Sequence, residues 1–220
     1  MTFTRTAFDE ELRKLQEDLL RMAAVVEEML HISIEALDKR DDVLADAAIA
    51  QDDEVDGYNV SIENKCLELI ALQQPAAKDL RIIAAALKII TDIERCGDYA
   101  VDIAKTVKEL SHEPVFKPLV DIPKMADLVK KMLREALEGF VQRDLEKIQR
   151  MIEDDDLVDH FYNDLHEELA VLVEKDGKLA RQAFHLLLLG RYLERIADHI
   201  TNIGERVYYV ETGESKELHQ

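Results

Sequence analysis

Pairs of carboxylates spaced one helical turn apart are the residues of this sequence best suited to chemistry. Four such pairs recur at matched positions in the two halves of the chain, and two of them are followed by a further polar residue one turn later. They are Asp52/Asp56, Glu94/Asp98, Asp155/Asp159 and Glu194/Asp198, with Asp102 after the second pair and Asn202 after the fourth.

The spacing of these pairs favours a bound cation. On a helix, residues i and i+4 lie on one face about 5–6 Å apart at Cβ, and like charges there destabilise the helix by about 0.2–0.5 kcal/mol per pair. A multivalent cation would offset that repulsion. A donor set made only of oxygen suits Mg, Mn, Ca or ferric iron and matches Zn or Cu poorly. The pattern therefore predicts metal sites, and a solvated acidic face is the alternative interpretation.

Arginines and histidines lie next to the carboxylate pairs, and we expect them to support or flank the sites. Arg95 and Arg195 follow the glutamate of each Glu-x-x-x-Asp pair and are expected to steady the carboxylates by charge-assisted hydrogen bonds. His160 and His199 adjoin Asp159 and Asp198, but neighbouring helical residues point about 100° apart. We therefore expect both histidines to be flanking surface residues, although the second site could recruit one.

An internal repeat contains the pairs. An offset of 103 aligns residues 40–56 with 143–159, and an offset of 100 aligns 81–107 with 181–207. The change of offset places a three-residue deletion in a loop of the second copy. Three of the four prolines cluster near 113–123, where the copies meet. We therefore predict two domains, residues 1–115 and 116–220.

Each copy has the apolar period of long helices. Apolar residues alternate by three and four positions, as from Phe8 through Leu12, Leu15 and Leu19, and seven Gly with four Pro leave few turns. The predicted helices cover residues 6–39, 42–73, 76–112, 120–142, 145–175 and 178–210. Gly57 and Gly97 lie inside helices and are attributed to close helix approach. The predicted fold is all-α, with two tandem three-helix bundles built from six long antiparallel helices.

Composition excludes several classes of function. The net charge of −19, from 28 basic and 47 acidic side chains, argues against nucleic acid as a partner and against adhesion to an anionic membrane. No apolar run approaches the roughly 18 residues of a membrane span, and the acidic, amphipathic start is unlike a signal peptide. Cys66 and Cys96 form no CxxC, and we expect them to be buried, reduced thiols of a cytoplasmic protein. No phosphate-cradling glycine loop, nucleophile elbow or HExxH motif occurs.

Three motifs together resemble the PhoU family, the accessory regulators of the bacterial phosphate-specific transport system. They are the segment 73–81 (QQPAAKDLR), the repeated ERxxD at 94–98 and 194–198, and the opening from Phe8 to Met22. The resemblance covers nearly the whole chain. It implies a six-helix, two-bundle fold in the cytoplasm.

The resemblance also implies cofactors and partners. Family members hold multinuclear metal clusters, reported as iron in some, on paired E(D)xxxD motifs that correspond here to the four pairs. Asn202 opposite Asp102 departs from the repeat and removes one negative charge from the second site. The implied partners are the transporter's ATPase subunit and the phosphate-sensing histidine kinase, with membrane association only through them. A homodimer is also expected.

Three hypotheses follow. The first is a non-enzymatic, metal-binding regulatory adaptor. The second is a metal-dependent enzyme of ferritin-like (di-iron) or phosphohydrolase type, and the third is a scaffold whose acidic stripes bind no specific ion.

Overall fold

Long helices joined by short turns dominate the computed structural model, which describes residues 5–113 and 120–218. The elements are α1 (Arg5–Lys39), α2 (Asp42–Ile49), α3 (Asp52–Gln73), α4 (Ala77–Ser111), α5 (Asp121–Gln142), α6 (Leu145–Lys175), the short 3₁₀ helix η1 (Gly177–Leu179) and α7 (Ala180–Thr212). No strand occurs in the described ranges. None of the helices found there is long and apolar enough to cross a membrane. The all-α prediction is confirmed.

Local sequence explains where α2 and α6 begin. Asp41 accepts hydrogen bonds from the backbone N–H groups of Val43 and Leu44 at the start of α2. Asp144 does the same for Glu146 and Lys147 at the start of α6. Such N-cap side chains satisfy donors that the first turn leaves unpaired. Apart from one interruption, the predicted helix ends lie within two residues of the observed ones.

That interruption corrects the predicted helix 42–73. The segment is two helices, because α2 ends at Ile49 and α3 begins at Asp52. The Gln51 N–H donates to the Ala48 carbonyl, and the Gln51 carbonyl then accepts from Glu54 and Val55 as α3 starts. The break places Asp52, Asp53 and Glu54 in a first turn. Acidic side chains are stabilised there by the unpaired N–H groups and the helix dipole.

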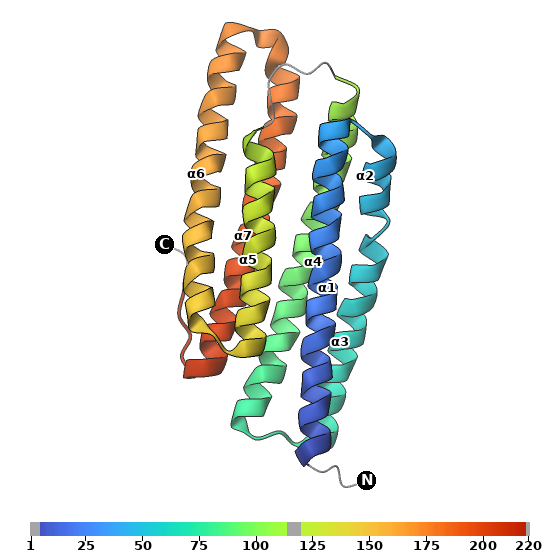
Figure 1. Ribbon diagram of the computed structural model, residues 1–220, viewed down its shortest axis with the longest axis vertical. Helices are drawn as coiled ribbons and strands as arrows, with labels where there is room; N and C mark the ends of the chain where they lie inside the picture. Colours follow the sequence, from blue (N-terminus) through green and yellow to red (C-terminus); the bar gives the residue numbers. More distant parts are fainter. Residues whose placement is uncertain (1–4, 114–119, 219–220) are drawn as a thin grey trace.

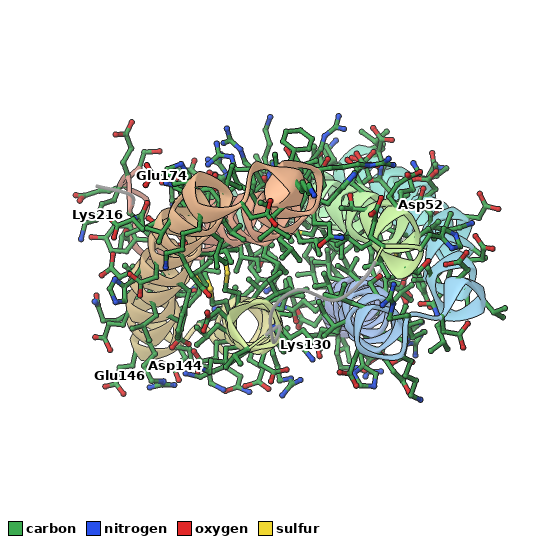
Figure 2. The ribbon with its side chains drawn as sticks, turned by 90° about the horizontal axis from the view of Figure 1, so that it is seen from above. Asp52, Lys130, Asp144, Glu146, Glu174 and Lys216 are labelled. Carbon is green, nitrogen blue, oxygen red and sulfur yellow. The ribbon has the colours of Figure 1, made fainter. Side chains whose placement is uncertain are left out.

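Two bundles lie side by side. The first is formed by α1 to α4 and the second by α5 to α7, with α4 packed along α7 and α1 against α5. In Figure 1, α1 and α5 are in front and α4 and α7 behind, and Figure 2 shows the same two layers from above. The predicted boundary between residues 115 and 116 lies outside the described residues.

The seam between the bundles follows the repeat. Cys96 of α4 lies with its Sγ 3.8 Å from the carbonyl oxygen of Ile196, the residue that matches it at the 100-residue offset. Both residues are fully buried, and Cys66 is also a buried free thiol, as predicted. The two copies therefore meet through equivalent positions, and their apolar residues belong to one continuous core.

Candidate metal centre

The first carboxylate group consists of Asp52 and Asp56 on α3 and Glu94 and Asp98 on α4. Burial raises the pKa of Asp52, and the charges of Asp56 and Asp98 raise it further. Burial also raises the pKa of Glu94, and Asp98, Asp56 and Asp52 add to that increase while Arg95 opposes it. These four side chains therefore act on one another through their charges across two helices. Figure 2 labels Asp52 at the rim of the first bundle.

Close packing of α3 on α4 brings this group together. A Cβ on Gly97 would lie only 3.3 Å from Cγ1 of Val55, which is itself buried. Gly97 therefore permits the close helix approach that was predicted. Gly57 has no such role, because no described atom of another helix lies within 4 Å of the place a Cβ would take, and that prediction is wrong.

The second carboxylate group consists of Asp155 and Asp159 on α6 and Glu194 and Asp198 on α7. Burial raises the pKa of Glu194 most, followed by the charge of Asp198, and Asp159 adds a smaller increase. The Glu194 side chain is 14 % exposed, and its Oε1 accepts a 2.5 Å hydrogen bond from Arg191. Its Oε2 is buried without a hydrogen-bond partner.

Arginines support both groups, as predicted. Nη1 of Arg95 lies 2.7 Å from Oδ2 of Asp98, and Nη1 of Arg195 lies 3.0 Å from Oδ2 of Asp198. Each contact spans three residues on one helix. Charge-assisted pairs of this kind hold the aspartate in place and partly neutralise it.

Arg191 makes the two groups unequal, and the sequence reasoning missed it. At the 100-residue offset its counterpart is Thr91, whose hydroxyl donates to the Leu87 carbonyl oxygen. Arg191 instead binds Glu194 and lies 5.9 Å from the centre of the Tyr162 ring. A comparison of the two copies for charge differences would have found it.

Asp102 and Asn202 lie toward the seam between the bundles. The charge of Asp102 raises the pKa of Tyr192 on α7, after the larger effect of burial. The Asn202 amide donates to Oδ1 of Asp92 on α4 at 3.3 Å. The same oxygen lies 3.0 Å from Nδ1 of His199. His199 is therefore a half-buried seam residue and not the flanking surface residue expected. His160 is exposed, as expected.

The donor chemistry of both groups suits a hard cation. The donors are carboxylate oxygens, and the buried, unpartnered Oε2 of Glu194 has the character of a ligand atom. Within the described ranges, however, no three or more His, Cys, Asp or Glu side chains converge closely enough to hold a metal ion. The carboxylates described here interact with one another through their charges, and metal binding stays a prediction.

Comparison with known proteins decides the family. The family model described as "PhoU domain" matches residues 19–107 and 122–207, which are the two bundles in turn. The chain belongs to the PhoU family. The two matches confirm the internal repeat, one copy in each bundle.

Curated relatives and solved structures agree. The chain is 39 % identical over 216 residues to the "Phosphate-specific transport system accessory protein PhoU homolog" of Clostridium acetobutylicum, covering 98 % of this chain and 99 % of that one. It is 40 % identical over 204 residues to the Aquifex aeolicus homologue, covering 93 % and 92 %. The crystal structure of PhoU from Pseudomonas aeruginosa superposes with a TM-score of 0.89 at 31 % identity, covering 94 % of this chain and 100 % of that one.

Proposed function

We propose that this protein is a non-enzymatic regulator of phosphate uptake and phosphate-starvation signalling. It acts in the cytoplasm as an adaptor between the ATPase subunit of the phosphate ABC transporter and the phosphate-sensing histidine kinase, and it functions as a homodimer. The observation that carries the proposal is full-length similarity to relatives named as accessory proteins of the phosphate-specific transport system.

The proposal includes metal binding at the two carboxylate groups. Asp52, Asp56, Glu94 and Asp98 would hold metal on the first bundle, with Asp102 beside them. Asp155, Asp159, Glu194 and Asp198 would hold it on the second, with Asn202 beside them. We propose multinuclear clusters with iron as the first choice and Mg, Mn or Ca as alternatives. The raised pKa values of Asp52, Glu94 and Glu194 support this, because a bound cation would compensate their charges.

A deletion strain tests the regulatory function. Cells without the protein are expected to express phosphate-scavenging genes even when phosphate is abundant. The ATPase subunit and the kinase are expected to copurify with the protein, less well at high salt if charged rims steer the contact. Normal gene expression together with no copurification at any salt would show that the regulatory proposal is wrong.

Elemental analysis tests the metal sites. Asp52→Asn with Asp56→Asn is expected to lower the metal content of the first bundle only. The matched control, Asp155→Asn with Asp159→Asn, should lower only that of the second. Unchanged stoichiometry in both variants would exclude these carboxylates as ligands. Turnover of ferrous iron or a phosphoester by the metal-loaded parent would instead favour the enzyme hypothesis.

A further inference from the structure

Within the described residues, α5 is about three turns shorter at its N-terminal end than α1. Arg40 and Arg143 match at the 103-residue offset and end their helices in the same left-handed conformation, with φ of 57° and 59°. The same offset aligns Asp121, the first residue of α5, with Asp18 inside α1. Residues 5–17 of α1 therefore have no helical counterpart in α5, a difference of about 20 Å at 1.5 Å per residue. Figure 1 shows α5 starting well short of the end of the α6–α7 pair, whereas α1 reaches the end of α3 and α4.

In the first bundle those three turns cover the ends of α3 and α4. Phe8, Leu12 and Leu15 form their apolar side and are buried. Glu11 pairs with Lys65 of α3 at 2.7 Å, and Arg5 with Asp79 of α4 at 2.6 Å. The first bundle thus shows what kind of helix fits this position.

In the second bundle the corresponding place is a surface groove. A hollow of about 490 Å³ lies between the first residue of α5, Asp121, and the C-terminal half of α6. Val171 and Leu172 form its apolar part. Val171 is 47 % exposed, and Leu172 is half-buried although its counterpart Leu69 is only 5 % exposed. At the position of Leu172 the groove therefore exposes apolar surface that the first bundle buries.

The rim of the groove is acidic. Asp121, Asp164, Glu167 and Glu168 line it, together with Lys175. Glu168 is the counterpart, at the 103-residue offset, of Lys65, the residue that binds Glu11 in the first bundle. The charge at this one position is thus reversed between the bundles. A helix that fits this groove needs basic residues where α1 has acidic ones.

We propose that this groove docks a basic amphipathic helix of a partner protein. Its apolar residues follow the i, i+4, i+7 spacing of Phe8, Leu12 and Leu15, and Lys or Arg flank them. The first helix of a second copy is a poor occupant of this groove because its Asp9, Glu10 and Glu11 would meet the acidic rim. The groove supplies the proposed adaptor with a contact surface, so its biological use rests on the proposed function, whereas the binding itself depends only on the shape and charge of the groove.

A synthetic peptide tests the proposal with the full-length protein. The basic probe copies residues 5–18 of α1 with five acidic positions replaced by lysine, and binding is measured by fluorescence anisotropy. The positions are Asp9, Glu10, Glu11, Glu17 and Asp18. The unchanged acidic copy and a basic copy with serine at the positions of Phe8, Leu12 and Leu15 are the control peptides. Both are expected to bind at least tenfold more weakly than the basic probe.

Two charge-matched variants locate the binding. Glu167→Lys with Glu168→Lys is expected to weaken binding of the basic probe at least tenfold. Glu146→Lys with Glu153→Lys reverses two exposed glutamates near the other end of α6 and should change it less than twofold. Circular dichroism checks that both variants fold. Equal weakening by both variants, or equal binding of the serine copy, would reduce the interaction to general attraction by net charge and overturn the proposal.

Two other possible occupants of the groove would give different results in these experiments. If replacing residues 114–119 with a Gly-Ser linker tightens probe binding tenfold, the chain's own segment fills the groove and the proposal is wrong. If the probe dissociates a dimer in sedimentation, a second copy is the occupant and the proposal is again wrong. Failure of these peptide measurements leaves the deletion phenotype untouched, so the groove and the regulatory function fail separately.

Discussion

Glu94 sits in an electrostatic environment that opposes its own charge. Burial and three neighbouring aspartates raise its pKa, while Arg95 gives only partial compensation at 3.9 Å. Asp52 shares this environment but also occupies the first turn of α3, where the helix dipole favours a negative charge. The helix dipole therefore stabilises the charge of Asp52 but not that of Glu94. Substitutions at the two positions should affect stability differently.

We predict that Glu94→Gln stabilises the metal-free protein by about 0.2–0.5 kcal/mol at neutral pH because like-charge repulsion is relieved. A raised pKa means that the folded state holds this proton more readily than the unfolded state does. The contribution of Glu94 therefore lowers stability as pH rises from its ordinary value of 4.5 through the raised one. The gain from Glu94→Gln should accordingly shrink on acidification through that window.

The control for this prediction is Glu54→Gln, in the exposed first turn of α3. It should lower the free energy of unfolding by about 0.3 kcal/mol or more, because it removes a favourable dipole interaction. Urea titrations with chelator present measure the change in the free energy of unfolding for each variant. A change of the same sign in both variants would show that like-charge repulsion does not act on Glu94.

Cys66 is protected by its surroundings. Burial raises the pKa of this thiol to about 12, so almost no reactive thiolate exists at pH 8. We predict that a thiol reagent leaves Cys66 unmodified in the folded protein and modifies it within minutes in denaturant. The measurement is mass spectrometry after timed exposure, with an unfolded sample as the control. Rapid modification under native conditions would show that the end of α3 opens frequently.

Helices differ in how much space neighbouring atoms leave at their glycines, so two Gly→Ala substitutions should have opposite effects on stability. Gly57→Ala in α3 meets open space and should stabilise the protein by about 0.5–1 kcal/mol through helix propensity. A Cβ on Gly139 of α5 would lie 3.2 Å from the Asp144 carbonyl oxygen and 2.8 Å from Ile148 Cδ1. Gly139→Ala should therefore lower stability, by about 1–2 kcal/mol. Thermal unfolding of the two variants measures the difference, and a stabilising Gly139→Ala would contradict the observed packing.

Helices could be predicted where residues close together in the sequence determine their period and their ends. The helical period and the caps Asp41 and Asp144 depend only on residues that are close together in the sequence. The bundle architecture could therefore be predicted from them. The break before Asp52 could not, because a run of apolar and acidic residues fits one long helix as well as two. The carboxylate pairs were found because spacing alone places them on one face and the repeat doubles the signal.

The seam contacts were not predicted because they join distant positions. His199 meets Asp92 across 107 residues, and Asn202 meets the same carboxylate across 110. Nothing in the helical period says which side of α7 faces α4. The pairing of Arg191 with Glu194 lies within one helix, by contrast, and comparison of the two copies could have revealed it.

At the scale of the whole molecule, α4 and α7 join the two carboxylate groups. Each helix supplies one Glu-x-x-x-Asp pair, and each also carries seam residues within a turn of that pair. Asp92 precedes Glu94 by two positions, and His199 follows Asp198 directly. The polar residues that join the two bundles therefore lie next to the carboxylate groups of both bundles.

We predict that Asp92→Ala lowers the free energy of unfolding by about 1–2 kcal/mol, because it removes the acceptor that the Asn202 amide and His199 share. Asp92 is only 14 % exposed, so water replaces these contacts poorly. The control is Asp46→Ala, which breaks a pair with Lys108 at a side chain that is 61 % exposed and should cost less than about 0.5 kcal/mol. Calorimetry of both variants measures the costs. If Asp92→Ala is no more costly than Asp46→Ala, then the polar contacts of the seam add nothing, and apolar packing of α4 on α7 alone holds the bundles together.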